Sequence, residues 1–297
     1  MPDSYLPPPQ QAVRWVEQAL GARVLRISRL VGGLTADMDR LTVQGRTDEP
    51  FDVVLRRWSA GAEWTIGLVD RESAGLSALA DRDLPVPRLL AYDATGEQAG
   101  VAGLLMSALP GEPVLRPPDL PDYLEQLATM LVRIHDVPAE LEPTDPHPYH
   151  ENADWIGDAA LSRAALEAAA AASLKEQQVL VHGDYQPFNA LWRDQRLSGV
   201  VDWTFAGRGP RGLDVGHCRL NLAVLFSAEA AERFLDCYEA EAGLRVDPLV
   251  DIRSLLAFDL GWPQFIPLQV AGRAPVDGPG MAGRVAEVLR AAVARLP

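Results

Sequence analysis

Apolar positions divide the chain into a front part with a two-residue period and a rear part with a helical period. Apolar residues at helical spacing predict a helix over residues 10–20, ended by Gly21. The pattern then alternates, which predicts strands over residues 24–30, 40–43, 51–58, 88–94 and 101–107. Residues 62–80 again read as a helix. The front part is therefore expected to be a small, mostly antiparallel sheet with one inserted helix.

The rear part, after Pro110-Gly111, is expected to be mostly helical. Apolar residues at helical spacing line one face of a segment that begins near Leu120 and ends near His135. Residues 158–177 are rich in Ala, the strongest helix former. Short apolar runs at 179–181 and 199–201 are typical of buried strands. The pattern is helical from residue 213 to the end, with breaks at residues 261–263 and 273–275 and a loop over 274–283.

Composition is that of an ordinary globular protein, with 297 residues, 48% of them hydrophobic. No apolar run approaches the roughly 18–20 residues of a membrane span, so we expect no membrane partner. The first residues lack a basic segment followed by an apolar one, which predicts a cytoplasmic protein rather than a secreted one. Cys218 and Cys237 are too few for a disulfide framework and are expected to act as small hydrophobic residues.

The formal net charge of −14 bears on the choice of partner. A nucleic acid would be repelled unless a local basic patch existed, and the sequence contains no run of Lys and Arg. The charge favours cationic small molecules, or it serves solubility alone. Lys175 is the single lysine, so any phosphate in the front part must be held by arginine.

Candidate chemistry is concentrated between residues 181 and 203. His182-Gly183-Asp184 is followed by Asn189 and then by Asp202. Transfer of the terminal phosphoryl group of ATP to a hydroxyl needs a carboxylate near the hydroxyl proton and oxygen ligands for Mg²⁺. A short hairpin between residues 191 and 199 could bring Asn189 and Asp202 together. Taken singly, these residues could equally be an Asx turn and a helix or turn cap.

This order and spacing resemble the catalytic loop and metal-binding motif of the aminoglycoside phosphotransferase and choline kinase-like family. These proteins are the small-molecule relatives of the protein kinases, and the resemblance spans about residues 10 to 270. It implies an α+β, protein-kinase-like two-lobe fold. Residues 1–109 would form a nucleotide-binding lobe, an antiparallel sheet with one helix, and residues 110–297 a mostly helical catalytic and acceptor-binding lobe.

The resemblance also implies roles for the residues of the motif. Asp184 would be the catalytic base or the group that orients the hydroxyl, while Asn189 and Asp202 would hold Mg²⁺. His182 would be a structural member of the loop. Phe188 stands where many relatives have a small residue, which could narrow the site near the acceptor.

The front lobe is expected to hold the phosphates. Gly33 and Thr35 lie between the first two strands, where the family has its phosphate loop, although an ordinary hairpin turn would read the same. On the third strand Arg56 takes the place of the family's usual lysine, with Glu72 as its partner, and Arg57 is left in solvent. In the alternative reading both arginines form a solvated edge and Glu72 is an exposed helix charge.

The segment at residues 103–111 resembles the strand and hinge that bind adenine through main-chain groups. By position, the carbonyl of Ser107 and the amide of Leu109 would contact the base, and Met106 would form a wall of the pocket. These contacts suit ATP and leave GTP possible. Asp214 is expected to cap a helix and to brace the catalytic loop.

The acceptor is less well defined by the sequence than the reaction. It should lie between Asp184 and the helices after residue 213. Asp251 and Asp259, eight residues apart on one expected helix, could receive an amine, or could be solvated or capping acids. The sequence thus predicts an ATP- and Mg²⁺-dependent O-phosphotransferase for a small, cationic hydroxyl compound such as an aminoglycoside. A macrolide, choline or homoserine acceptor, or a catalytically silent nucleotide-binding protein, remains the alternative, and the oligomeric state stays open.

Overall fold

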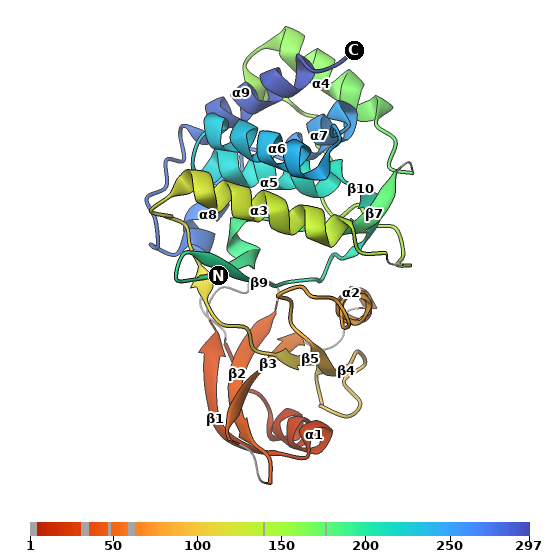
Figure 1. Cartoon of the computed structure of the whole chain (residues 1–297), viewed down its shortest axis with the longest axis vertical. Coiled ribbons are helices and arrows are strands. Elements are labelled where there is room, and N and C mark those ends of the chain that lie inside the picture. Colours follow the sequence, from red (N-terminus) through yellow and green to blue (C-terminus); the bar gives the residue numbers. More distant parts are fainter. Residues whose placement is uncertain (1–4, 31–35, 47–48, 59–62, 139, 176) are drawn as a thin grey trace. The chain divides into compact units, whose positions relative to one another are not determined.

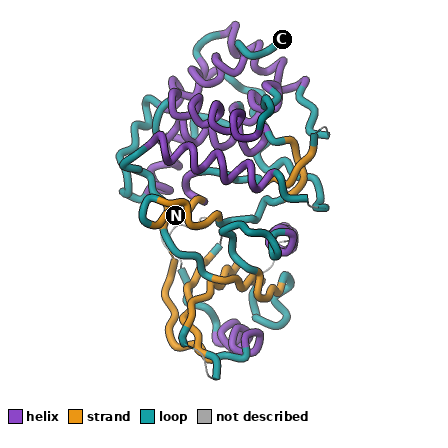
Figure 2. Tube along the Cα trace, in the orientation of Figure 1, coloured by secondary structure: helices purple, strands orange, loops and turns teal. Residues whose placement is uncertain are grey.

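The structure, a computed structural model, separates into two compact units, Met1–Leu109 and Pro110–Pro297. It describes residues 5–30, 36–46, 49–58, 63–138, 140–175 and 177–297. Figure 1 shows the course of the chain, and Figure 2 shows that strands dominate the first unit and helices the second. None of the helices in the described part of the chain is long and apolar enough to cross a membrane.

Unit 1 is built on an antiparallel sheet with the strand order β1-β2-β3-β5-β4. Its strands are β1 Arg23–Leu30, β2 Asp37–Gln44, β3 Phe51–Trp58, β4 Leu89–Asp93 and β5 Ala102–Ser107. Helix α1 (Gln10–Leu20) precedes the sheet, and α2 (Glu63–Ala78) is inserted between β3 and β4. The expected antiparallel sheet with one inserted helix is confirmed, although β2 begins three residues earlier than its alternation predicts.

The core of unit 1 lies between the sheet and α1. Leu41 and Val43 of β2 alternate with polar residues, and Val53 and Leu55 stand at alternate positions of β3; these four side chains are buried. They pack in one cluster with α1, which contributes Ala12, Trp15 and Val16. The two-residue period of the sequence therefore arises because one face of the sheet is covered by a helix.

The prediction that Arg57 is solvated is wrong. Arg56 and Arg57 do point to opposite faces of β3, but both side chains are buried. The guanidinium of Arg57 donates from Nε and Nη2 to Asp39 Oδ2 over 3.0 and 2.8 Å. The N-terminal segment completes this site, because Leu6 O accepts from Arg57 and Tyr5 Oη donates to Asp39. No pattern in the residues before α1 predicts that they lie over this face of the sheet.

Unit 2 is organised around α5 (Gly212–Leu225), in which every residue from Gly212 to Val224 is buried. Helix α5 packs against α6 (Ala228–Ala242), α7 (Pro248–Leu255) and α9 (Met281–Val293). The other helices are α3 (Leu120–His135), α4 (Ala159–Ala171) and α8 (Trp262–Val270). Helix α5 is buried all round, its polar residues included, because it lies at the centre of these helices (Figure 1).

Two small sheets carry the segment with the candidate chemistry. Strand β7 (Gln178–Val181) pairs antiparallel with β10 (Gly207–Pro210). The second sheet has the order β6-β8-β9, with β6 Glu112–Pro113, β8 Ala190–Arg193 and β9 Arg196–Val200. The expected hairpin between residues 191 and 199 is confirmed as β8 and β9, whereas β6 and β10 were not predicted.

Two helix boundaries in unit 2 differ from the predictions. The Ala-rich helix ends at Ala171 rather than at residue 177, because Ala172 is already extended and the chain turns toward β7. Helix α9 begins at Met281, inside the segment predicted to be a loop. At the end of α4, tertiary packing therefore outweighs the helix propensity of the local sequence.

Candidate active site

Asp214 fixes the start of the segment His182–Asn189, here called the 182–189 loop, which joins β7 to β8. Its carboxylate is fully buried in the first turn of α5 and accepts hydrogen bonds from the backbone amides of His182 and Gly183, over 2.7 and 2.8 Å. The structure thus shows the expected brace. The expected cap is absent, because Arg211 is the N-cap residue of α5 and makes no capping hydrogen bond.

His135 and Tyr238 extend the hydrogen bonding of Asp214 into the core of unit 2. His135 Nε2 lies 3.1 Å from Asp214 Oδ2, and His135 Nδ1 lies 2.7 Å from Tyr238 Oη. Burial lowers the pKa of His135, which places a neutral imidazole between these groups. A neutral ring with its proton on Nε2 satisfies both contacts, since it donates to the carboxylate and accepts from the tyrosine. Burial alone would raise the pKa of Asp214, but the contacts with His135 and the His182 amide outweigh it and keep this pKa low.

Gly183 allows the chain to turn sharply between the brace and Asp184. Its φ of 83° lies in the left-handed region, and a Cβ there would come within 2.3 Å of Phe205 O. Backbone packed this closely leaves no room for a side chain. The sharp turn therefore depends on glycine at this position.

Asp184 lies at the centre of the 182–189 loop with its carboxylate held on both oxygens. Oδ1 accepts from Gln186 Nε2 over 2.6 Å and from His217 Nε2 over 2.9 Å, and Oδ2 accepts from Asn189 Nδ2 over 2.9 Å. His147 Nε2 is 3.6 Å from Oδ1. Burial would raise the pKa of Asp184, but the imidazoles of His147 and His217 at its carboxylate lower it well below its usual range. Asp184 is therefore an ionised carboxylate with a fixed orientation.

Asn189 and Asp202 are brought together at the base of the β8–β9 hairpin. Asn189 O accepts from Val201 N over 2.9 Å, and the strand register pairs the neighbouring residues Ala190 and Val200. The Asn189 amide nitrogen is used by Asp184, through both its carboxylate and its main-chain oxygen. The amide oxygen is then the part of Asn189 that remains to act as a ligand.

Asp202 has an unusual backbone conformation. Its φ of 67° lies in the left-handed region, where a residue other than glycine costs of order 1–3 kcal/mol. Its Oδ1 accepts from Thr204 Oγ1 over 2.6 Å. Such strain often occurs at functional sites. An amide oxygen and a carboxylate at one hairpin base are the hard oxygen donors that Mg²⁺ prefers, so these residues fit the ion.

In unit 1, Arg56 and Glu72 form a buried ion pair. Arg56 Nη1 donates to both carboxylate oxygens of Glu72, over 3.0 and 3.2 Å, and both side chains are almost inaccessible to solvent. The structure thus pairs the two residues that the sequence analysis selected. The readings of a solvated arginine edge and of an exposed Glu72 are wrong, because Arg56, Arg57 and Glu72 are all buried.

The other candidate nucleotide-binding residues of unit 1 lie in β5, in the segment after it, and between the first two strands. Met106 is buried in β5, opposite Val54 of β3. Ser107 and Leu109 are half-buried at the end of unit 1, where Ser107 exchanges hydrogen bonds with the backbone of Arg88. Gly33 and Thr35 lie outside the described residues.

The acceptor role considered for Asp251 and Asp259 is not supported. Helix α7 ends at Leu255, so the two residues do not share a helix. Asp251 is fully buried and forms an ion pair with Arg219 of α5. Asp259 is half exposed, and its Oδ2 lies 3.5 Å from His150 Nε2. The sequence could not reveal the partner of Asp251, because Arg219 lies 32 residues earlier in the chain.

Sequence reasoning missed the two histidines at Asp184. His217 lies three residues after Asp214 on α5, so the two side chains project from the same face of the helix. This three-residue spacing could have identified His217 from the sequence as a neighbour of the 182–189 loop. His147 lies in an irregular segment after α3, and nothing in its surrounding sequence points to Asp184. The rings of His147 and His217 stack in parallel, with centroids 4.1 Å apart.

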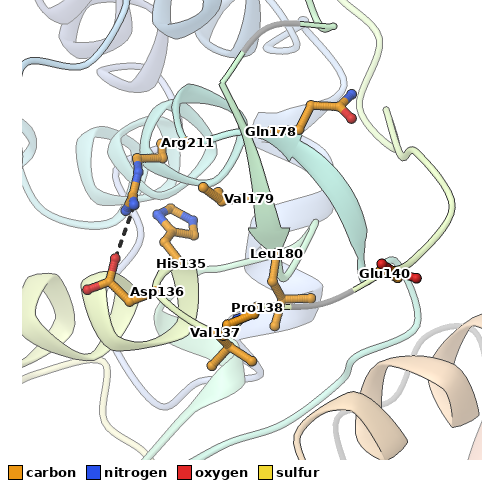
Figure 3. Close-up of a pocket in the computed structure, with 9 residues that line it drawn as sticks. All are labelled: His135, Asp136, Val137, Pro138, Glu140, Gln178, Val179, Leu180 and Arg211. Atoms are coloured by element: carbon orange, nitrogen blue, oxygen red, sulfur yellow. Dashed lines mark hydrogen bonds and ion pairs between the residues drawn. The ribbon is translucent and has the colours of Figure 1, made fainter.

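A pocket of about 520 Å³ lies elsewhere in unit 2 and shares no residue with the Asp184 group (Figure 3). It is lined by the end of α3 and by β7, and Arg211 at its edge donates to Asp136 over 3.1 Å. Its lining residues are His135, Asp136, Val137, Pro138, Glu140, Gln178, Val179, Leu180 and Arg211. His135 lines this pocket and also contacts Asp214.

Comparison with known proteins agrees with this geometry. A model of the phosphotransferase enzyme family matches residues 29–249. No curated protein matches the chain significantly.

Several solved structures share the fold at low sequence identity. A putative aminoglycoside phosphotransferase from Ralstonia eutropha JMP134 is 16% identical with a TM-score of 0.63, over 96% of this chain and 98% of that one. Macrolide 2′-phosphotransferase MphH from Brachybacterium faecium is 21% identical with a TM-score of 0.58, over 91% and 96%. A thermostable mutant of aminoglycoside phosphotransferase APH(4)-Ia, in ternary complex with AMP-PNP and hygromycin B, is 19% identical with a TM-score of 0.61, over 95% and 98%. These likenesses establish the two-part kinase-like fold.

The buried histidines predict a pH dependence of stability above the range in which carboxylates titrate. Burial lowers the pKa of His135 and of His217, so both are neutral when folded, whereas an unfolded histidine has a pKa of about 6.5. As the pH falls below about 6.5, the unfolded state binds protons that the folded state does not, and the free energy of unfolding decreases. Each group contributes up to about 1.4 kcal/mol per pH unit. Urea unfolding between about pH 7 and pH 5 measures this slope, which His217→Asn should reduce; a stability that is flat over this range contradicts the assignment.

Proposed function

The chain belongs to the phosphotransferase enzyme family, and we propose that it transfers the γ-phosphoryl group of ATP to a hydroxyl group of a small molecule. The observation that carries the proposal is the position of Asp184. Its ionised carboxylate is fixed in a loop that also holds Asn189, and Asp202 lies at the base of the adjoining hairpin. A base, an amide oxygen and a second carboxylate are the groups that phosphoryl transfer to a hydroxyl requires.

Asp184 would orient the acceptor hydroxyl and accept its proton. A carboxylate with a low pKa is a weak base toward a free alcohol, so its main contribution is to align the attacking oxygen, with proton transfer late in the reaction. The contacts from Gln186, His217 and Asn189 hold the carboxylate in one orientation. This favours catalysis because the carboxylate needs no reorganisation when the hydroxyl attacks.

Asn189 and Asp202 would hold Mg²⁺ through the amide oxygen and the carboxylate. The ion would neutralise the charge that develops on the phosphate oxygens. Asn189 Nδ2 bonds to Asp184, so the same side chain links the metal ligand to the base. Their relative positions are thereby coupled through one amide group.

Arg56 would bind phosphate oxygens in place of a lysine. Its guanidinium is planar and keeps its charge, and Glu72 fixes it from α2. Gly33 and Thr35 would supply further contacts to the phosphates. The main chain at Ser107 and Leu109, beside Met106, would contact the base, which suits ATP and is compatible with GTP.

The acceptor would be a small hydroxyl compound that carries an amine. The net charge of −14 favours a cationic ligand over an anionic one. Solved structures with the same fold include a complex with hygromycin B and a macrolide 2′-phosphotransferase. An aminoglycoside-type compound is therefore the first class of acceptor to test, followed by macrolides, choline and homoserine.

Asp184→Asn should lower kcat by roughly 10²–10⁴-fold, because the amide retains the shape of the side chain but cannot accept the hydroxyl proton. The protein is incubated with ATP, Mg²⁺ and the panel of acceptors, and phosphorylated product is measured by mass spectrometry. Asp194→Asn is the matched control, since that carboxylate is 90% exposed in the β8–β9 turn. ATP binding without transfer to any acceptor would favour a silent nucleotide-binding protein.

The two arginines of β3 allow a second test with matched variants. Arg56→Met combined with Glu72→Leu removes a buried ion pair as a unit, which a fold tolerates better than the loss of one partner. We expect ATP affinity to fall by about 10–100-fold, the value of one hydrogen bond to a charged group. Arg57→Met combined with Asp39→Leu is the control and should leave nucleotide affinity unchanged. Equal losses in both variants, measured by calorimetry, would contradict a phosphate role for Arg56.

A further inference from the structure

Two histidines lie at one oxygen of Asp184. Together the three side chains could bind a metal, and none of them is assigned to Mg²⁺. His217 Nε2 is 2.9 Å from Asp184 Oδ1, and His147 Nε2 is 3.6 Å from the same atom. The ligand atoms of these three residues all lie within 4.8 Å of one another. They come from an irregular segment, the 182–189 loop and α5, so the cluster is a product of the tertiary fold.

The donor set differs in kind from that at Asn189 and Asp202. Imidazole nitrogen suits zinc, copper, nickel and iron, whereas Mg²⁺ prefers oxygen ligands. Two histidines and one carboxylate also form the three-ligand set of open zinc sites, which leave a fourth position for water. The ligand chemistry therefore points to a divalent transition-metal ion.

Two of the three separations between ligand atoms are close to those around an ion of this class. With bonds of about 2.0–2.2 Å, ligand atoms around a tetrahedral zinc ion lie about 3.4 Å apart. The separations of 2.9 and 3.6 Å lie on either side of this value. At 3.6 Å, His147 Nε2 is too far from Oδ1 for a hydrogen bond, and within the described residues this buried atom has no hydrogen-bond partner.

His147 is the most exposed of the three side chains. Its side chain is 31% exposed and lies in an irregular segment, whereas those of Asp184 and His217 are largely buried. The stacked, parallel rings of His147 and His217 place their Nε2 atoms on the same side, toward Asp184. A tilt of the His147 ring would bring the three lone pairs toward one point.

We propose that His147, Asp184 and His217 form a binding site for one divalent transition-metal ion of the zinc class, separate from the Mg²⁺ ligands. An ion bound there would take the place of the His217 hydrogen bond to Oδ1 and hold the two histidines at the carboxylate. Its positive charge would make Asp184 a weaker base toward the acceptor hydroxyl and so inhibit transfer. This consequence rests on the proposed function, whereas binding of the ion does not.

The test measures metal binding by the tag-free, full-length protein without nucleotide or acceptor. Co²⁺ is titrated and followed by its visible absorption, and Zn²⁺ is then added as a competitor. We expect one ion per chain, displacement of Co²⁺ by Zn²⁺, and retention of the bound ion in millimolar Mg²⁺. His147→Asn and His217→Asn should each weaken binding by about 100-fold or more, since partners of the ligands alone contribute about 10–100-fold.

His150→Asn is the matched control, because His150 also lies beside a carboxylate, Asp259, but has no second histidine there. This variant should bind the ion like the wild type. If His217→Asn fails to fold, as judged by circular dichroism, the partly exposed His147 decides the outcome. The proposal is overturned if the wild type binds no Co²⁺, if Mg²⁺ displaces the ion, or if His147→Asn binds as tightly as His150→Asn. Because no ATP is present, this outcome is independent of whether phosphoryl transfer occurs.

Discussion

The candidate active site depends on one buried carboxylate, Asp214. It accepts two backbone amide hydrogen bonds, from His182 and Gly183, at the point where β7 ends and the 182–189 loop begins. Hydrogen bonds to a charged group contribute about 1.5–3 kcal/mol each, and an unpaired buried charge would be costly. The neutral imidazole of His135 completes the pairing by donating to Oδ2, the oxygen that also accepts from the His182 amide. Asp214 thus attaches the 182–189 loop to α5, the buried central helix of unit 2.

The chemistry follows from how the rest of the loop is arranged on this support. The left-handed turn at Gly183 places Asp184 beside α5, where His217 lies one helical turn after Asp214. Asn189 closes the loop by donating to the carboxylate and the main-chain oxygen of Asp184. The hairpin then returns the chain to Asp202, which adopts a strained conformation. These polar side chains are hydrogen-bonded to neighbouring groups, so the site needs little structural rearrangement during the reaction.

The sequence predicted much of this arrangement because the features involved are local or periodic. Alternation over residues 51–58 indicated β3 and placed Arg56 and Arg57 on opposite faces. The choice of Arg56 and its pairing with Glu72 came from the resemblance to the family. The spacing from Asp184 to Asn189 and the short hairpin indicated the site. The failures have a common physical cause, which is contact between distant segments. Arg57 is buried because residues before α1 lie over it, Asp251 is buried because it meets α5, and His147 reaches Asp184 from a loop with no recognisable pattern.

The central claim, that Asp214 sets the geometry of the 182–189 loop, is tested most directly by amide hydrogen exchange at His182 and Gly183. In the wild type both amides should exchange slowly, because each is buried and bonded to the carboxylate. In Asp214→Asn the charge is lost, and both amides should exchange roughly 10–100-fold faster, in line with the loss of about 1.5–3 kcal/mol per bond. Unchanged protection at both positions in a folded Asp214→Asn protein would contradict the account.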